Sequence, residues 1–326
     1  MKINRNAWRI QKYGGPAVLT PFQDVLSQPG PEEIVIQTKA SAVTRADTML
    51  REGTPKFARL FLGLRKPRND LVGAGFSGEV IAVGREVSRF AVGDEVFGEA
   101  GLQFGANASH ILMNENGVIM PKPRELSHEE AAVMCDGPLT SYNFLHRIAA
   151  VRRNARVLIL GGSGSLGSAA VQIAAHMGAE VSATTSARNA GLVASLGAGH
   201  VIDYSQEDFT MGADTYDVIF DTLGVSSFGQ AKRVLTPNGR YICPVLGCDL
   251  LGASLVTSVF GRKRAQFSAT GMLKPAELRE QLSQVLEIVE ARALAPVIDR
   301  TYPLNALPEA HRYVDTGRKV GNVVAA

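Results

Sequence analysis

The sequence predicts an α/β protein with two domains, a β-rich one and one built on a doubly wound parallel sheet. Three observations carry this prediction. The chain has 326 residues, which is too many for one small core. Residues 1–122 have the pattern of short strands separated by glycine-containing turns. From residue 123 onward, apolar strands alternate with helices, as expected for parallel strands joined by crossover helices.

The β-rich part is predicted from alternating and β-branched stretches. EEIVIQTKASAV (32–43) alternates as a half-buried strand should. Glycine turns separate the strands expected over 76–84, 91–99 and 108–123. Ser127 with Glu130 three residues on forms a capping box, which marks the start of a helix over 126–134.

The second part contains the segments that favour a parallel sheet. Short apolar runs predict strands over 155–160, 180–186, 200–204, 217–224, 239–247 and 266–271. Helices are expected over 165–178 and 187–198, so that both faces of the sheet are covered. A longer amphipathic helix over 275–294 follows the last expected strand.

Composition excludes several classes of protein. Hydrophobic residues make up 45% of the chain and charged residues 20%, and the net charge is only +3, which is too mild to indicate a nucleic-acid surface. The three cysteines (Cys135, Cys243 and Cys248) are too few for a disulfide framework and are expected to be small buried side chains. No secretory signal or membrane-spanning run is visible, so we expect a cytoplasmic protein.

A glycine-rich turn lies between the strand at 155–160 and the helix at 165–178. Gly162, Gly164 and Gly167 match GxGxxG in the strand–turn–helix context that this motif needs to bind a dinucleotide. Gly162 permits a tight turn, Gly164 lets a pyrophosphate approach the backbone, and Gly167 lets the helix pack on its strand. The helix N-terminus offers unpaired N–H groups to the phosphates. We therefore predict that residues 162–167, with Ser163, Ser165 and Leu166, bind the cofactor; the alternative is a turn without a ligand.

The residues after the next strand indicate which dinucleotide binds. An acidic residue usually holds the ribose 2′-hydroxyl of NAD at this place. Here Thr184, Thr185 and Ser186 occupy it, with Arg188 just beyond. Hydroxyls and a guanidinium favour a 2′-phosphate, so we predict NADPH, with Tyr204 adding a hydroxyl or stacking on adenine. The alternative for Arg188 is a solvent-facing residue in a first helical turn.

Seven motifs, spread over most of the chain, point to a family. They are ASAVTRADTMLREG (40–53), LVGAGFSGEVIAVG (71–84), FAVGDEVFG (90–98), GPLTSYNFL (137–145), GGSGSLGSAAVQIA (161–174), LGAGHVIDY (196–204) and VIFDTLG (218–224). With them the chain resembles the zinc-free quinone oxidoreductases of the medium-chain dehydrogenase/reductase superfamily. The insertion at 54–68 is similar to that of chloroplast envelope quinone oxidoreductase homologues and reticulon-4-interacting proteins.

The resemblance implies an architecture. A GroES-like catalytic domain made of residues 1–122 and 272–326 would wrap around a Rossmann domain of residues 123–271, with a cofactor cleft between them and a homodimeric assembly. It also implies that Thr140 lies near the nicotinamide ribose. The backbones of Leu223, Val245 and Phe267 would then line the track from adenine to nicotinamide.

Zinc enzymes of this superfamily carry a cysteine, a Gly-His-Glu motif and a second cysteine at the catalytic metal. At the matching places this chain has Thr44, then Gly73, Ala74 and Gly75, and then Asp136. A tetrahedral zinc needs several converging N, S or O ligands, which these residues do not supply, and the six histidines share no ligand spacing. We therefore expect no bound metal.

The expected chemistry follows from the absent metal ligands. Without a Lewis acid to stabilise an alkoxide, the favoured reaction is hydride transfer from NADPH to an acceptor that delocalises the arriving charge, such as a quinone, an enone or an enal. The resemblance makes Thr44 the candidate catalytic residue, because it stands where quinone oxidoreductases commonly have an Asn, and its hydroxyl would bond the nicotinamide ribose or the acceptor oxygen. The alternative for Thr44 is a structural residue at a strand end, and Asp47 is expected to be a structural acceptor.

Other hypotheses remain open. The chain could be a low-turnover NADPH-binding scaffold, because binding alone requires the same turn. It could also be an interaction protein lying against a membrane. Phe57, Phe61 and Leu62 of the insertion, and the apolar stretch 250–260, are expected to cover the acceptor pocket or to form a subunit contact.

Overall fold

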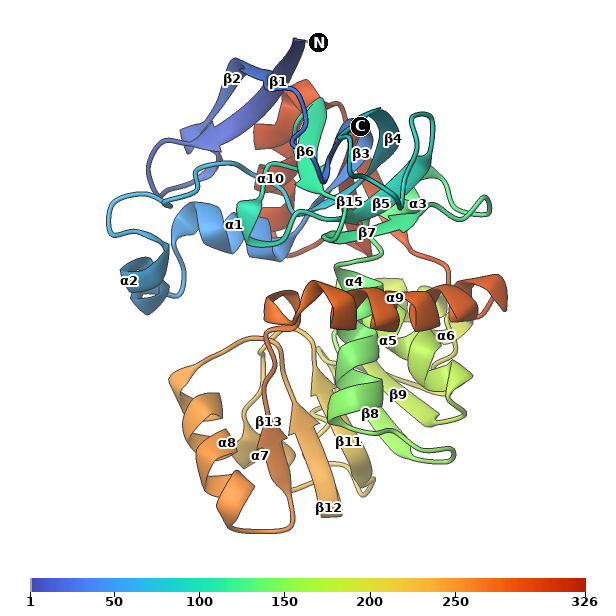
Figure 1. The fold of residues 1–326 in the computed structure, drawn as a ribbon. Coiled ribbons are helices and arrows are strands. Elements are labelled where there is room, and N and C mark those ends of the chain that lie inside the picture. Colours follow the sequence, from blue (N-terminus) through green and yellow to red (C-terminus); the bar gives the residue numbers. More distant parts are fainter. Residues whose placement is uncertain (1) are drawn as a thin grey trace. The chain divides into compact units, whose positions relative to one another are not determined.

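The computed structural model describes residues 2–326, except for the side chain of Phe61. The chain divides into two compact units. Unit 1 comprises Met1–Asp136, Lys274–Leu282 and Val297–Ala326, and unit 2 comprises Gly137–Leu273 and Ser283–Pro296. Unit 1 is mainly antiparallel β-structure and unit 2 contains a parallel sheet, which confirms the predicted fold class (Figure 1).

A seven-stranded sheet forms the centre of unit 1. Its strands follow the order β14-β15-β3-β4-β5-β7, with β6 also pairing to β3. Runs of consecutive residues in β3 and β4 are buried, including Ile36 opposite Val80, so these two strands are covered on both faces over much of their length. The strands are β3 (Glu33–Val43), β4 (Gly75–Val83), β5 (Glu95–Glu99), β6 (His110–Asn114), β7 (Val118–Pro121), β14 (Ile298–Tyr302) and β15 (Asn322–Ala325).

A separate hairpin and four helices complete unit 1. The hairpin joins β1 (Ile3–Ile10) to β2 (Leu19–Leu26). The helices are α1 (Arg45–Glu52), α2 (Arg59–Leu62), α3 (His128–Ala132) and α10 (Leu307–Asp315). Arg51 is fully buried and ties α1 to α10: its guanidinium donates to Asp315 at 2.8 Å and to the carbonyl of Gly14 at 3.0 Å, and it lies 3.2 Å from Nδ1 of His311. A buried charge must be paired in this way, so the network joins segments 260 residues apart in sequence.

Unit 2 contains a six-stranded parallel sheet with the order β10-β9-β8-β11-β12-β13. The order reverses between β8 and β11, which is where ligands bind in doubly wound sheets. The strands are β8 (Arg156–Leu160), β9 (Glu180–Thr185), β10 (His200–Asp203), β11 (Tyr216–Asp221), β12 (Leu235–Ile242) and β13 (Arg264–Gln266). The central strands are apolar runs because they are buried on both faces.

The helices of unit 2 are short. They are α4 (Gly137–Tyr142), α5 (Ser165–His176), α6 (Ala190–Ser195), α7 (Phe228–Ala231) and α8 (Cys248–Val259), with a π-helical segment η4 (Asn143–Ile148) after α4. The long helix α9 (Pro275–Glu290) contributes residues to both units. No helix in the described part of the chain is long and apolar enough to cross a membrane.

Some predicted elements differ from the observed ones. The stretch 108–123 is two strands, because a turn closed by the N–H of Gly117 and the carbonyl of Asn114 separates β6 from β7. The last strand of unit 2 is Arg264–Gln266 rather than 266–271. The apolar stretch 250–260 lies mostly in helix α8, which periodicity did not reveal because both faces of that helix carry apolar side chains.

The division of the chain also differs from the predicted boundaries. Residues 123–136 belong to unit 1, because α3 packs against β3, β4 and β5. Residues 283–296, predicted in the catalytic domain, belong to unit 2. There the Tyr142 hydroxyl donates to Gln284 at 2.9 Å, and Gln172 exchanges two hydrogen bonds with the backbone of Ala295.

Candidate functional site

The glycine-rich turn lies at the carboxyl end of β8, directly before α5. Gly161 has a φ of +82°, which favours glycine. A Cβ on Gly167 would lie 2.0 Å from the carbonyl oxygen of Gly161, so only glycine lets the helix approach the turn this closely. A Cβ on Gly164, by contrast, would meet nothing nearer than 3.5 Å. That side of Gly164 is open at the N-terminus of a 12-residue helix, which is the space a pyrophosphate needs.

Hydroxyl groups at the end of β9 hold this turn in place. Thr184 accepts a hydrogen bond from the N–H of Gly161 at 3.1 Å. The Thr185 hydroxyl donates to the hydroxyl of Ser163 at 2.9 Å, and the side-chain amide of Asn189 donates to the same oxygen at 3.2 Å. Thr184 and Thr185 therefore shape the turn.

The candidates for the ribose phosphate follow β9. Ser186 is partly exposed, and Arg188 is exposed in the short 3-10 helix Ala187–Asn189. Tyr204, after β10, is 65% exposed, and its N–H donates to the carbonyl of Thr185 at 3.2 Å. The three predicted side chains thus belong to the ends of two neighbouring strands, and no charged carboxylate occupies 184–186.

The predicted nicotinamide track brings together the loops after β8, β11 and β12. A Cβ on Gly161 would lie 2.5 Å from a methyl group of Leu223, and a Cβ on Gly224 would lie 2.9 Å from the Cβ of Val245. Phe267 follows β13, and its side chain packs against the core of unit 2. These contacts place Leu223 and Val245 in neighbouring loops at the carboxyl edge of the sheet.

Thr140 belongs to helix α4. The hydroxyl of its neighbour Ser141 donates to the carbonyl of Leu166 at 2.8 Å, in the first turn of α5. A Cβ on Gly137 would lie 2.7 Å from the carbonyl of Ser165, so α4 and α5 meet closely. Thr140 is partly exposed beside this contact.

Asp221 is a positioning residue that the sequence analysis missed. It ends β11, is fully buried, and its carboxylate accepts hydrogen bonds from the N–H groups of residues 223, 224, 225 and 226 at 2.8–3.2 Å. The Tyr241 hydroxyl donates to the same carboxylate at 2.8 Å. One side chain thus holds the loop that contains Leu223. The signal was present, because an Asp followed by Gly and Ser is typical of a side-chain-capped turn.

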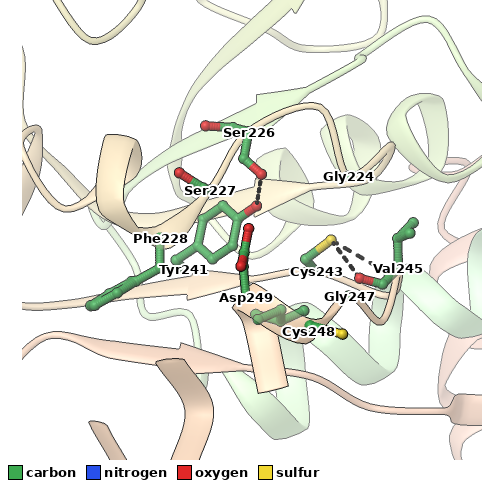
Figure 2. A pocket seen from close by; sticks show the side chains of 11 residues that line it. Gly224, Ser226, Ser227, Phe228, Tyr241, Cys243, Val245, Gly247, Cys248 and Asp249 are labelled. Carbon is green, nitrogen blue, oxygen red and sulfur yellow. Dashed lines mark hydrogen bonds between the residues drawn. The ribbon is translucent and has the colours of Figure 1, made fainter. Parts of the chain in front are cut away.

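A cavity of about 250 Å³ opens between the loops after β11 and β12 (Figure 2). Gly224, Tyr241, Cys243 and Val245 line it, together with the first turn of α8. Burial raises the pKa of Cys243 to about 12, so this residue remains a thiol at neutral pH. Cys135 is also buried, but Cys248 is exposed, so the expectation that all three cysteines are buried is wrong for Cys248.

In unit 1, Thr44 is the N-cap of α1. Its N–H and its hydroxyl donate to the same carboxylate oxygen of Asp47, at 2.8 and 2.7 Å, and the hydroxyl accepts from the N–H of Asp47 at 3.2 Å. This is a capping box with an acidic partner. In this arrangement the hydroxyl proton of Thr44 points to Asp47.

Asp47 lies in a cluster of ionisable groups that come from separate segments. Burial raises the pKa of Asp47 to about 6, and burial with the nearby charges of Asp136 and Asp47 raises the pKa of Glu99 to about 7. Burial lowers the pKa of Lys319, whose ammonium donates to the carbonyl of Gly321 at 2.6 Å. We call these four side chains (Asp47, Glu99, Asp136 and Lys319) the carboxylate cluster. The sequence analysis singled out no role for Glu99 or Lys319.

The residues at the superfamily's catalytic metal position do not fit a zinc ion. The hydroxyl of Thr44 is hydrogen-bonded to Asp47. Ala74 has only a methyl group, which cannot bind a metal. A Cβ on Gly75 would lie 2.5 Å from the carbonyl of Ala132, so no side chain fits there. Across residues 2–326, no three His, Cys, Asp or Glu side chains come close enough together to hold a metal.

Comparisons with known proteins agree with this architecture. Residues 30–124 match the alcohol dehydrogenase GroES-like domain, and residues 196–324 match the zinc-binding dehydrogenase family. The chain is 30% identical to the mitochondrial NAD(P)H oxidoreductase RTN4IP1 of Mus musculus, over 98% of this chain and 88% of that protein. It is 28% identical to a 2-methylene-furan-3-one reductase of Solanum lycopersicum, over 98% of this chain and 78% of that protein.

Solved structures of similar proteins have the same fold over almost the whole chain. The quinone oxidoreductase from Coxiella burnetii superposes with a TM-score of 0.84 at 26% identity, covering 99% of both chains. The CurK enoyl reductase superposes with a TM-score of 0.87, also at 26% identity and 99% of both chains.

These likenesses, with the fold and the glycine-rich turn, define an NAD(P)H-dependent oxidoreductase of the quinone and enone reductase group. The chain belongs to the medium-chain dehydrogenase/reductase superfamily, in its quinone oxidoreductase-like branch, which confirms the predicted resemblance.

Proposed function

We propose that this protein is a zinc-independent reductase that transfers hydride from NADPH to a quinone or an α,β-unsaturated carbonyl. The observation that carries the proposal is the end of β9, where Ser186 and Arg188 follow the strand and no carboxylate is present. A 2′-phosphate placed there meets no repulsion and gains charge-assisted hydrogen bonds. The proposal of NADPH over NADH rests on this arrangement.

The acceptor chemistry is proposed from unit 1. When hydride adds to an enone or quinone, negative charge moves onto the acceptor oxygen, and a hydrogen-bond donor there lowers the barrier. Thr44 is our candidate donor. Because the pKa of Asp47 is near 6, a protonated Asp47 is accessible near neutral pH and would donate to the Thr44 hydroxyl, which frees that hydroxyl to donate to the acceptor. Glu99, with a pKa near 7, holds a proton in the same cluster.

The test is the initial rate of NADPH oxidation by purified, chelator-treated protein. A short 2-alkenal, a cyclic enone and an ortho-quinone serve as parallel acceptors. We expect turnover with at least one of them, undiminished by the chelator and faster with NADPH than with NADH. Turnover that requires added zinc would contradict the proposal.

A second candidate function is a low-turnover NADPH-binding scaffold. The same cofactor turn serves it, since binding alone requires that turn. Tight NADPH binding without oxidation by any of the three acceptors would favour the scaffold over the reductase.

We also propose that the protein is a cytoplasmic homodimer. Helix α8 exposes a strip of apolar side chains beside β13, which is the edge strand of the unit 2 sheet. The strip comprises Leu251, Leu255, Val256, Val259 and Phe260. A strip of this kind beside an open sheet edge fits a second copy of the chain. Light scattering should give twice the mass of 34.8 kDa, and Leu255→Gln with Val259→Gln should give a monomer.

A further inference from the structure

Residues 54–68 form a small ordered lobe between α1 and β4, which we call the basic lobe. It contains the 3-10 helix Lys56–Ala58 and helix α2, which projects from the remainder of unit 1 (Figure 1). Arg59 attaches it: the guanidinium donates to the carbonyls of Glu52 and Gly53 at 2.7 and 2.9 Å and lies 4.5 Å from the ring centre of Tyr13. The Tyr13 hydroxyl donates to the carbonyl of Gly63 at 2.7 Å. The lobe therefore has a fixed conformation.

All charged residues of this lobe are basic. No acidic residue lies between Glu52 and Asp70, whereas five basic residues do. Arg59 is occupied in the attachment, and Lys66 lies 3.3 Å from Asp70 at the base of the lobe. The exposed basic side chains are Lys56, Arg65, Lys66 and Arg68. A segment of this kind attracts an anionic surface.

Large apolar side chains are exposed among these charges. Phe57 is 46% exposed, Leu60 66% and Leu64 71%. Leu62 instead packs against the core of unit 1, so the lobe has an inner apolar contact and an outer apolar tip. Phe57 and Leu60 are three residues apart in successive helical turns, a spacing that puts both on one side.

We propose that the basic lobe binds the surface of an anionic lipid bilayer. Phe57, Leu60 and Leu64 would enter the boundary between headgroups and acyl chains, while the exposed lysines and arginines pair with anionic headgroups. A nucleic acid would use the same cations but would leave three large apolar side chains in water. A lobe of fifteen residues is also small against the ~800 Å² that each partner contributes to a specific protein interface. This inference does not depend on the proposed reductase activity.

The strip on α8 differs from the basic lobe in its arrangement of apolar residues and in the charge beside them. Four of its five apolar residues lie on a 12-residue helix next to a sheet edge and the fifth, Phe260, directly follows that helix, whose first turn contains the acidic residue Asp249. Such a surface suits another protein surface. The two exposed apolar regions therefore predict different partners.

The experiment is co-sedimentation of the full chain with phosphatidylcholine vesicles, with and without phosphatidylserine. We expect binding to the anionic vesicles only, and less of it as salt rises. The charge variant Arg65→Glu/Lys66→Glu/Arg68→Glu and the apolar variant Leu60→Gln/Leu64→Gln should each lower the bound-to-free ratio at least roughly tenfold. All five side chains are exposed, so both variants should fold, as thermal unfolding and NADPH binding will check.

Matched variants elsewhere serve as controls. Arg85→Glu/Arg152→Glu/Arg312→Glu makes the same change in net charge at three exposed arginines, and Val92→Gln removes an apolar side chain that is 62% exposed. Both should bind anionic vesicles like the wild type. As a second readout, Phe57→Trp should show a blue-shifted emission on anionic vesicles relative to the wild type, which reports burial of that side chain in lipid.

Several results would overturn the proposal. They are the absence of binding to anionic vesicles, equal binding by the lobe variants and the wild type, and equal loss of binding in the charge control. Displacement of the protein from vesicles by substoichiometric duplex DNA would assign the lobe to nucleic acid instead.

Discussion

The glycine-rich turn of unit 2 and the carboxylate cluster of unit 1 are built in opposite ways. The turn uses consecutive residues, backbone N–H groups and hydroxyls, and its critical positions lack a side chain. The cluster uses ionisable side chains from four separate segments. Burial raises the pKa of Asp47 and of Glu99 and lowers the pKa of Lys319, so it favours the neutral form of each side chain. The shape of the turn is set by its backbone, whereas the charge of the cluster depends on pH, because the pKa values of Asp47 and Glu99 are raised toward neutrality.

This difference predicts which substitutions each region tolerates. A turn built from backbone fails when atoms are added, because no side chain can move aside. A cluster of buried acids becomes more stable when one carboxylate is made neutral, because like charges repel one another strongly where water is excluded. The predictions below test this contrast, from the largest expected effect to the smallest.

The first prediction adds one methyl group to the turn. Gly167→Ala places a Cβ 2.0 Å from the carbonyl of Gly161, so the helix must move off the turn. We expect NADPH to bind at least about 100-fold more weakly in a fluorescence titration, a loss of about 3 kcal/mol. Gly191→Ala is the control, since its Cβ would meet nothing within 4 Å, and it should bind like the wild type. Normal affinity in Gly167→Ala would show that the turn is not packed as described.

The second prediction removes the charge that holds the neighbouring loop. Asp221→Asn replaces one of the two carboxylate oxygens with an NH2 group, which cannot accept the hydrogen bonds that this oxygen receives from the loop N–H groups or from Tyr241. We expect a loss of about 2–3 kcal/mol in the free energy of unfolding, measured in urea. Asp208→Asn is matched, because Asp208 caps Thr210 in an exposed turn, and it should unfold at the same urea concentration as the wild type. Equal effects of the two variants would contradict the role given to Asp221.

The third prediction concerns the choice of nucleotide. Arg188→Glu should weaken NADPH binding by roughly 10–30-fold and leave NADH binding unchanged, because only NADPH carries the 2′-phosphate. Arg152→Glu makes the same charge change at another exposed arginine of unit 2 and should alter neither affinity. Equal weakening of both nucleotides by Arg188→Glu would instead indicate general electrostatic attraction.

The fourth prediction tests the carboxylate cluster through pH. The pKa of Glu99 is raised from 4.5 to about 7, so the folded state binds the extra proton between these values. Stability linked to Glu99 is therefore present near pH 4.5 and is lost as the pH rises through about 7. Glu99→Gln should unfold like the wild type at pH 5 and be more stable by about 1 kcal/mol at pH 8.

Glu95, on the same strand, is the control, because its pKa is lowered whereas that of Glu99 is raised. The hydrogen bond from Lys122 lowers the pKa of Glu95, so its contribution is present above its unfolded pKa and is lost as the pH falls. Glu95→Gln should therefore be no more stable than the wild type at pH 8. If Glu99→Gln behaved in the same way, Glu99 would be an ordinary surface carboxylate.

The strand, glycine-rich turn and helix of this region were predicted well because all of the information that specifies them is local. A strand, a glycine pattern and a helix follow one another within residues 155–178, and periodicity detects each of them. The same holds for the strands of unit 2 and for β3 and β4. Helix α8 was missed because both of its faces are apolar, and so was the β1–β2 hairpin, whose turn sequence was not recognised.

The carboxylate cluster could not be predicted in the same way. Glu99, Asp136 and Lys319 become neighbours only through the pairing of β5, the position of α3 and the return of the chain at β15. Nothing near Glu99 in the sequence distinguishes it from a surface carboxylate. The arrangement of Thr44 was likewise hidden, since a capping box with Asp47 and a free catalytic hydroxyl have the same sequence.

The position of β15 has a consequence for synthesis of the protein. This strand pairs with β3 on one side and β14 on the other, so it lies within the sheet although it follows every other described strand in the sequence and is synthesised after them. Most of unit 2 emerges earlier as one continuous segment, Gly137–Leu273, and can complete its sheet first. Until residues 322–325 arrive, the nascent chain presents Ser41, Ala42 and Val43 of β3 unpaired, and this stretch can pair with another chain although most of the fold has already been made.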